Sequence, residues 1–300
     1  MPSLFADAHE HRFTVNSVEI FARVGGSGPP LLLIHGFPQT HAMWHRLAPA
    51  LMQRFTCVMP DRRGYGFSAC PEDDPGHTAY SKRAMTGDLV AVMEKLGHTR
   101  FAAVGHDRGA RVAYRMALDH PQRVATLTVL DIVPTYAMWH ELTVRLAMKS
   151  YHWLFLAQPA PLPEMLIEPN PAAFLDYSMA SWTKSKDLSA FAGDALAEYR
   201  YHFAPPEHVR AACGDYRAGA TSDLAADEAD RAAGLKIACP TLALWGETGI
   251  AGKAANPLLT WQQWCKEVEG HAIDSGHFVA EENPDAVLAH LLPFLERHGR

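Results

Sequence analysis

The chain has 300 residues, of which 48% are hydrophobic and 20% are charged. This length and balance suit one large globular domain that carries an insertion and buries a sizeable core. The formal net charge is −6, which argues against nucleic acid as a partner. An acidic chain can still bind an anionic small molecule, but only in a pocket that is locally basic.

The sequence shows no pattern typical of a membrane span, a secretory signal peptide or a zinc site. No apolar run reaches about 18 residues, so we expect no membrane-spanning helix and no membrane partner. The first residues lack the basic and apolar segments of a secretory signal peptide, so a cytoplasmic protein is expected. The five cysteines are scattered and form no Cys-x-x-Cys pair, which favours free thiols over a disulfide framework or a zinc site.

An alternation of apolar and polar residues over 15–24 indicates an antiparallel strand, and short apolar runs indicate the other expected strands. In chain order they are residues 15–24, 31–34, 56–59, 101–104, 124–130 and 241–246, with a weaker strand near 267–268. Helical periodicity is expected over about 81–96. A second helix follows the strand at 101–104 and runs to about 118, and a third closes the chain. Strands that alternate with helices predict a mostly parallel sheet covered by helices on both faces.

The pattern changes after about residue 135. Residues 136–222 hold aromatic-rich helical stretches and proline-rich loops with little strand character. Because this block interrupts the sheet in sequence, we predict a helical cap over the strand ends. It is inserted between the strands at 124–130 and 241–246, which we expect to be strands 6 and 7 of the complete sheet. The predicted division is a core of residues 1–137 and 223–300 and a cap of residues 138–222.

The most informative segment is residues 101–109, which read Phe-Ala-Ala-Val-Gly-His-Asp-Arg-Gly. A strand, a Gly-x-Asp-x-Gly turn and a helix follow one another, which is the nucleophile-elbow layout of the α/β-hydrolase fold. Serine usually occupies this turn, whereas here the residue is Asp107. A carboxylate can attack an alkyl carbon and form an ester, so we expect displacement at carbon rather than acyl transfer. The alternative is that Asp107 only caps the following helix.

The predicted base is His277, which stands beside a glycine just before the last helix, where this fold places its histidine. The alternative is a histidine on a surface loop. Two places could supply the acid that orients it. Glu247 follows the strand at 241–246, and Asp131 follows the strand at 124–130. We predict Asp131, which would fix the imidazole tautomer and stabilise the imidazolium; its alternative is a simple strand-end turn.

An oxyanion hole is also expected near the elbow. The backbone N–H of Arg108, just after the nucleophile, and that of Phe37, in the His-Gly-Phe-Pro segment, are the predicted donors. They would hold the oxyanion that forms on the Asp107 carbonyl when water attacks the ester.

Three segments together closely resemble the fluoroacetate (haloacetate) dehalogenases. They are Gly105–Arg111, Met116–Pro121 and Asp131–Tyr136. The elbow and the His-Gly-Phe-Pro motif are shared with epoxide hydrolases and haloalkane dehalogenases, but the likeness extends over nearly the whole chain. The resemblance implies the α/β-hydrolase fold, hydrolytic removal of halide from 2-haloacetates, no metal or organic cofactor, and a homodimer.

The resemblance also implies how a small anionic haloacid would be held. Arg108 and Arg111 match two family arginines that hold the substrate carboxylate, and the planar guanidinium suits bidentate capture. Such a pocket is the locally basic site that an acidic chain needs. The alternative for Arg111 is an exposed position on its helix.

A second group implied by the resemblance is a halide pocket. His152, Trp153 and Tyr216 match it, and they would supply an imidazole N–H, an indole N–H and a phenol O–H. Without the resemblance these three residues are ordinary helix aromatics that pack in a core. Trp182 is a further candidate for lining the pocket.

Other functions fit parts of the sequence. An epoxide hydrolase would use the same triad with two cap tyrosines, and it stays open because the predicted cap holds Tyr151, Tyr177, Tyr199 and Tyr201. A haloalkane dehalogenase would more often carry tryptophan after the nucleophile, where this chain has arginine. A non-catalytic ligand receptor of the same fold would usually lack the nucleophile, the base or the acid, and all three are present here.

Overall fold

The computed structural model describes residues 4–251 and 256–299. These residues form an eight-stranded sheet in the order β1-β2-β4-β3-β5-β6-β7-β8. The strands are β1 (Ala8–Val15), β2 (Val18–Gly25), β3 (Pro30–Ile34), β4 (Thr56–Pro60), β5 (Phe101–His106), β6 (Val124–Leu130), β7 (Thr241–Gly246) and β8 (Val268–Ile273). Strands β3 to β8 pair in parallel, whereas β1 pairs with β2 and β2 with β4 in antiparallel register.

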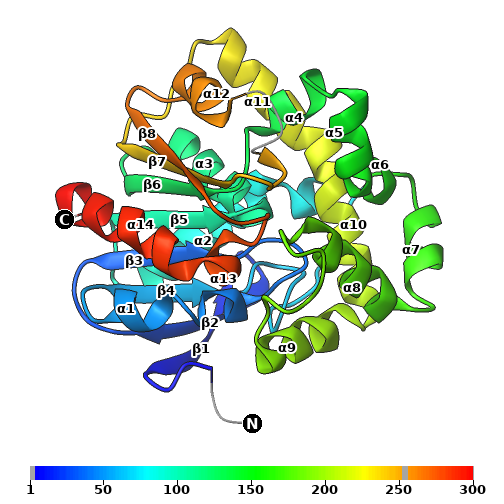
Figure 1. The fold of residues 1–300 in the computed structure, drawn as a ribbon, viewed down its shortest axis with the longest axis horizontal. Helices are drawn as coiled ribbons and strands as arrows, with labels where there is room; N and C mark the ends of the chain where they lie inside the picture. Colours follow the sequence, from blue (N-terminus) through cyan, green and yellow to red (C-terminus); the bar gives the residue numbers. More distant parts are fainter. Residues whose placement is uncertain (1–3, 252–255, 300) are drawn as a thin grey trace.

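Helices connect the strands and cover the sheet (Figure 1). In the core they are η1 (His41–Trp44), α1 (Ala48–Met52), η2 (Thr78–Tyr80), α2 (Lys82–Lys95), α3 (Arg108–Asp119), α12 (Pro257–Trp264), α13 (Val279–Glu282) and α14 (Pro284–His298). Figure 1 shows α14 in front of the sheet and α2 and α3 behind it. Strands β5 and β6 are buried along their whole length, because helices close both of their faces. The predicted α/β-hydrolase fold is therefore confirmed.

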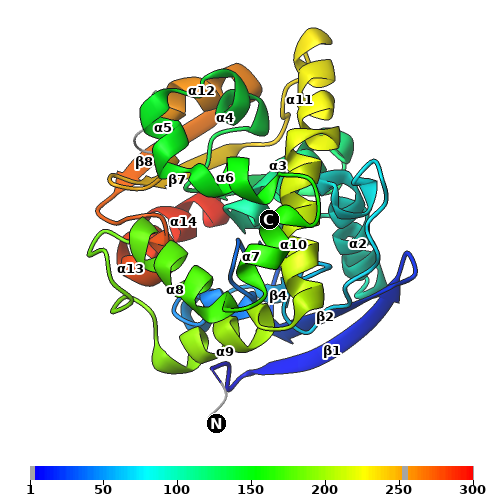
Figure 2. The same ribbon diagram turned by 90° about the vertical axis from the view of Figure 1, so that its right-hand side faces the viewer.

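A block of helices lies between β6 and β7, as predicted, at one end of the sheet (Figures 1 and 2). Its members are α4 (Thr135–His140), α5 (Val144–Lys149), α6 (Tyr151–Leu156), α7 (Leu162–Ile167), α8 (Pro171–Trp182), α9 (Gly193–Phe203), α10 (Pro206–Ala220) and α11 (Ser222–Ala232). We call this block the cap. The domain boundaries at residues 137–138 and 222–223 stay a prediction.

The predicted strand over residues 15–24 is partly wrong. The structure has a hairpin here, in which β1 ends at Val15 and β2 begins at Val18. The two turn residues, Asn16 and Ser17, both have positive φ (47° and 63°), and two residues in this region make a tight antiparallel hairpin turn. Polar residues dominate the outer strand, so its periodicity alone did not reveal it.

The elbow after β5 is a strained and crowded turn. Asp107 adopts φ 45° and ψ −122°, a conformation that side-chain-bearing residues rarely take. A Cβ at Gly105 would lie 2.5 Å from the Ala110 Cα, and a Cβ at Gly109 would lie 2.2 Å from the carbonyl oxygen of His35. Both glycines are therefore needed for space, because β5 and α3 approach too closely for a larger residue.

No helix within residues 4–251 and 256–299 has the length and apolar character needed to cross a membrane.

The crowding at the elbow gives a stability test. We expect Gly109→Ala to lower the free energy of unfolding by about 3 kcal/mol, because its Cβ would collide with backbone oxygens that cannot move independently. Gly193→Ala is the matched control: a Cβ on this α9 glycine meets nothing within 4 Å, and we expect a change of less than about 1 kcal/mol. Urea unfolding of both variants measures the difference. Equal stability of the two variants would contradict the packing argument.

Candidate active site

The Asp107 carboxylate lies at the centre of the buried site. Its Oδ2 accepts a hydrogen bond of 3.0 Å from the Phe37 N–H, and its Oδ1 lies 4.0 Å from Nε2 of His277. The side chain makes no capping hydrogen bond to α3 within the described residues, so the helix-cap interpretation is wrong. Burial alone would raise the pKa of Asp107, but the positive charges of His277, Arg111 and Arg108 outweigh burial and hold the pKa well below its usual range. Asp107 is therefore an ionised carboxylate with one oxygen fixed and the other facing an imidazole.

His277 is buried and bound to Asp131. The two side chains share a hydrogen bond of 2.5 Å, which the imidazole Nδ1 donates to Oδ2 of Asp131. Burial would lower the pKa of His277, but this hydrogen bond and the carboxylate charge of Asp131 raise it above the ordinary value of 6.5. The surface-loop interpretation of His277 is therefore wrong.

Backbone N–H groups hold Asp131 in place. Gly246 donates to its Oδ1 and Ile250 donates to its Oδ2, each at 3.0 Å. A Cβ at Gly249 would lie 2.3 Å from the same carboxylate, so this loop closes tightly around it. Glu247, the other candidate acid, is exposed. The structure therefore brings Asp131, and not Glu247, to the histidine.

Two buried histidines that sequence reasoning missed support this arrangement. His106 precedes the nucleophile, and burial lowers its pKa to about 4, so the neutral ring donates from Nε2 to the backbone carbonyl of His277 (2.9 Å). Burial lowers the pKa of His35 to about 3; its Nδ1 donates to the Gly36 carbonyl, and its Nε2 accepts from the Arg62 N–H. Their positions beside the elbow and the His-Gly-Phe-Pro motif are the signal that could have revealed them.

Both predicted arginines are buried against the site. Arg111 is 2% exposed and donates from Nη1 to Oγ1 of Thr135 (3.0 Å), so the exposed-helix interpretation is wrong. Its Nε has no hydrogen-bond partner among the described residues. Arg108 uses its Nε and Nη2 on Asp215, and only its Nη1 is left without a partner there. A cap carboxylate therefore already occupies the Nε and Nη2 edge of this guanidinium, and carboxylate binding by Arg108 stays a prediction.

The predicted cap aromatics surround the arginines. The Arg111 guanidinium lies 4.4 Å above the Trp153 ring, and the Arg108 guanidinium lies 4.2 Å above the Tyr216 ring. The rings of His152 and Tyr216 meet edge to face, with centroids 5.6 Å apart. Contacts of this kind stabilise a cation over an aromatic face. The structure thus brings together the two sets of residues that come from core and cap.

Several buried polar atoms around this cluster lack partners in the described part of the chain. They are Nδ1 of His152, Nε1 of Trp182, Oη of Tyr216, Nη1 of Arg108 and Nε of Arg111. Each unsatisfied buried polar group costs about 1–3 kcal/mol, so a folded protein rarely keeps five of them in one place. Simple core packing explains the rings but not these atoms. A small polar ligand at this position would satisfy them.

The tyrosines that kept an epoxide hydrolase open do not gather at the nucleophile. Tyr177 and Tyr201 are 67% and 72% exposed. The Tyr199 hydroxyl is buried, but it donates to Oε1 of Glu281 at 3.2 Å. Tyr151 shares a 3.5 Å contact with Ser178. Of the cap tyrosines, Tyr216 is the one beside the arginines.

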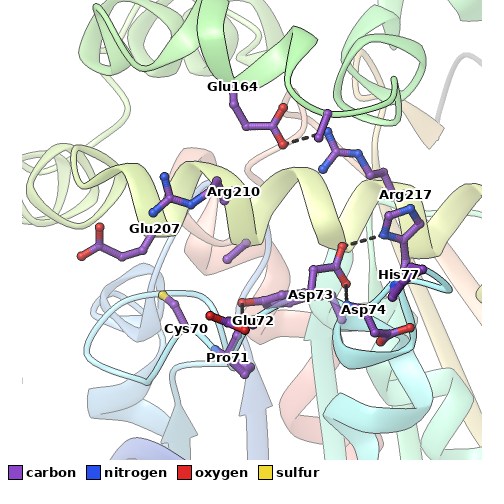
Figure 3. Close-up of a pocket in the computed structure, with 14 residues that line it drawn as sticks. Cys70, Pro71, Glu72, Asp73, Asp74, His77, Glu164, Glu207, Arg210 and Arg217 are labelled. Atoms are coloured by element: carbon purple, nitrogen blue, oxygen red, sulfur yellow. Dashed lines mark hydrogen bonds and ion pairs between the residues drawn. The ribbon is translucent and has the colours of Figure 1, made fainter.

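Another pocket, of about 570 Å³, lies between the loop at residues 70–77 and helices α7 and α10 (Figure 3). None of the predicted site residues lines it. Two pairs of its charged wall residues bind each other: His77 donates to Asp73 at 2.6 Å, and Arg217 lies 2.7 Å from Glu164. The reactive groups therefore belong to the Asp107 site and not to this pocket.

Comparison with known proteins shows which family this fold belongs to. The model of the alpha/beta hydrolase fold family matches residues 29–284, and the chain belongs to that family. It is 41% identical to a fluoroacetate dehalogenase from Burkholderia sp over 94% of this chain and 91% of that protein. It is also 30% identical to a soluble epoxide hydrolase from Corynebacterium sp., over 95% and 96% of the two chains.

Solved structures agree with this assignment. A Nostoc sp PCC 7120 protein, provisionally named an alpha/beta hydrolase, is 47% identical with a TM-score of 0.94 over 97% of this chain and 99% of that one. A Pseudomonas aeruginosa protein, provisionally named an epoxide hydrolase, is 43% identical with a TM-score of 0.93 over 99% and 98%. The chain is thus an α/β-hydrolase, and the resemblance to fluoroacetate dehalogenases is confirmed.

The contact between Asp131 and His277 predicts a shift in titration. Asp131→Asn removes the charge that raises the pKa of His277 and leaves burial, which lowers it. The charge of Asp107 still raises the pKa of His277 in this variant, so we expect that pKa to fall from its wild-type value, as measured by NMR titration of the imidazole. Asp88→Asn, which removes a buried carboxylate paired with Arg63, is the control and should leave the titration unchanged. An unchanged pKa in Asp131→Asn would contradict the assignment.

Proposed function

We propose that the protein hydrolyses 2-haloacetates, including the conversion of fluoroacetate to glycolate and fluoride. The observation that carries this proposal is the pair of partnerless, buried N–H groups on Arg108 and Arg111, in the helix that begins at the ionised Asp107. A carboxylate next to the reacting carbon would satisfy both N–H groups and neutralise the positive charge. The relative from Burkholderia sp supports the same substrate class.

The first half of the proposed reaction is a displacement at carbon. Oδ2 of Asp107 is held by the Phe37 N–H, so Oδ1 is the attacking oxygen. It forms a bond to the α-carbon in line with the halogen while the carbon–halogen bond breaks. The product is an ester of Asp107, and the halide leaves with the bonding electron pair. Because the nucleophile is already ionised, no base is needed for this step.

The departing halide would meet the cap donors His152, Trp153 and Tyr216. Fluoride leaves poorly and accepts hydrogen bonds strongly, so donors that bind it more tightly in the transition state lower the barrier. Burial lowers the pKa of His152 to about 3, so the ring is neutral and presents one N–H. The Trp182 indole N–H lies beside His152, with ring centroids 4.3 Å apart, and we propose that it lines the same pocket.

The second half of the proposed reaction is ester hydrolysis. Nε2 of His277 takes a proton from water, and the hydroxide adds to the ester carbonyl of Asp107. The Phe37 N–H and the predicted Arg108 N–H stabilise the oxyanion. Collapse releases glycolate, whose oxygen takes the proton from His277, and the freed Asp107 carboxyl ionises again. Asp131 holds the imidazole and stabilises its charged form. Side chains and peptide N–H groups perform every step, so the scheme requires no metal or organic cofactor.

Epoxide hydrolysis is the second candidate, since relatives with that name share the fold. It would use Asp107, His277 and Asp131 in the same order, with Tyr216 protonating the epoxide oxygen. The buried arginines argue against a neutral epoxide, because its binding would leave their N–H groups unsatisfied.

A third possibility is a non-catalytic receptor, which has no use for a complete nucleophile, base and acid. Parallel assays of fluoroacetate, chloroacetate and styrene oxide separate the three.

Each half of the proposed reaction can be blocked by one substitution. We expect Asp107→Asn to abolish fluoride release from fluoroacetate, because an amide is not a nucleophile. We expect His277→Asn to release at most one fluoride per site and to gain the mass of one carboxymethyl group on the peptide that holds Asp107. A fluoride electrode and mass spectrometry measure the two results. Full turnover by Asp107→Asn would end the proposal, and so would an unmodified His277→Asn.

We also propose that the protein is a cytoplasmic homodimer that associates through the cap. Apolar side chains on α5 and α7 support this: Val144 is 82% exposed, Met148 is 75% exposed and Met165 is 56% exposed. Figure 2 shows both helices on the outer side of the cap. Large apolar side chains that are this exposed on one side of a domain are typical of a protein–protein interface.

A charge placed in this patch tests the dimer. We expect Met148→Glu with Met165→Glu to turn a dimer into a monomer in light-scattering measurements, because a buried unpaired carboxylate opposes association. Leu259→Glu, on the core helix α12 and 57% exposed, is the control and should leave the dimer intact. A wild-type protein that is monomeric at micromolar concentration would refute this proposal.

A further inference from the structure

A buried carboxylate of the cap lies behind the predicted substrate arginine. Asp215, on α10 next to Tyr216, is completely buried. It accepts hydrogen bonds from Nε and Nη2 of Arg108 at 3.1 and 2.6 Å, and Arg108 Nη2 also donates to its backbone carbonyl. Sequence reasoning missed this residue, although it stands beside a predicted halide ligand.

Three further donors from the core contact the same carboxylate. Arg62 donates from Nη1 at 3.1 Å, the Tyr65 hydroxyl donates at 2.7 Å, and Lys82 donates from Nζ. These donors come from the loop after β4 and from the start of α2, whereas Asp215 belongs to the cap. Asp215 is therefore the point where one cap helix is held by several parts of the core.

The charges of this cluster do not cancel. Arg62, Lys82 and Arg108 are three cations, and they face Asp215 and Asp223, which lies 3.2 Å from Lys82. Two carboxylates against three cations leave one positive charge in excess. Since the whole cluster is buried, that excess charge is available to an anion bound beside it.

The surroundings of Arg108 hold its guanidinium in one position. Asp215 occupies the Nε and Nη2 edge, while the ring of Tyr216 lies 4.2 Å from the guanidinium and that of Trp153 lies 5.1 Å away. Gly219, one turn further along α10, lies so close that a Cβ would be 2.9 Å from Nη2 and 3.0 Å from Nη1. A carboxylate, two aromatic rings and helix α10 thus hold the guanidinium, and Nη1 is its nitrogen without a hydrogen-bond partner in the described structure.

We propose that Asp215 is a positioning residue that fixes Arg108 so that Nη1 points at the substrate carboxylate. It also keeps Arg108 from turning toward Asp107, the neighbouring carboxylate, which must stay free to attack. The proposal rests on the proposed function, in which Arg108 binds a carboxylate. Selectivity for anionic substrates then depends on a cap residue that never touches the substrate.

The test compares Asp215→Asn with Asp88→Asn, a matched loss of a buried carboxylate that pairs with Arg63 (2.6 Å) away from Arg108. We measure KM and kcat for chloroacetate and the Kd for glycolate. Losing one charged hydrogen bond to a substrate weakens binding roughly tenfold or more. We expect KM and the glycolate Kd to rise by about that factor in Asp215→Asn and to stay at wild-type values in Asp88→Asn.

Gly219→Ala is the second variant, in case Asp215→Asn does not fold. Its methyl group would displace the Arg108 guanidinium while Asp215 remains, so KM and the glycolate Kd should rise in the same way. A lower kcat with unchanged KM and Kd would show that Asp215 has only a structural role. A lower KM would show that Asp215 only reduces the positive charge of the site. Either result overturns the proposal. A wild-type protein that binds glycolate but does not dehalogenate chloroacetate would refute the proposed function alone.

Discussion

The structure depends on keeping one buried carboxylate ionised at a strained turn. A carboxyl group that is buried away from water normally has a raised pKa and binds a proton. Asp107 is buried in this way. The positive charges around it reverse the effect, and the Phe37 N–H fixes one of its oxygens. Gly105 and Gly109 let strand and helix approach closely enough for the turn to form. Every neighbouring group is arranged around this ion, including the buried histidines and arginines and the cap above them.

An acidic protein thereby builds a basic interior site. The net charge of −6 is spread over the whole chain, whereas Arg108 and Arg111 are buried side by side beneath the cap. Burial makes their charges act strongly over short distances, and partnerless N–H groups favour an anion that can accept from them. The cap contributes both the aromatic rings that cover these cations and, through Asp215, the carboxylate that holds one of them.

Short sequence patterns predicted the features of the fold and site that depend on residues adjacent in sequence. The elbow, the alternating strands and helices, and the sites of His277 and Asp131 follow from short motifs and their order. The β1–β2 hairpin was missed because its outer strand is mostly polar. The Arg108–Asp215 pair was missed because it joins residues more than a hundred positions apart, and no local pattern encodes such a contact. The predicted halide ligands came from family resemblance, since helix aromatics look alike in sequence whether they bind a ligand or fill a core.

The most direct test of the account is the origin of the oxygen in the first product molecule. With enzyme in excess over fluoroacetate in water labelled with heavy oxygen, attack by Asp107 followed by ester hydrolysis transfers a carboxylate oxygen of the enzyme to glycolate. The account predicts unlabelled hydroxyl oxygen in this glycolate and one heavy oxygen in the peptide that contains Asp107, both read by mass spectrometry. Heavy oxygen in the first glycolate, with an unlabelled peptide, would mean that water attacks the carbon directly and that Asp107 is not the nucleophile.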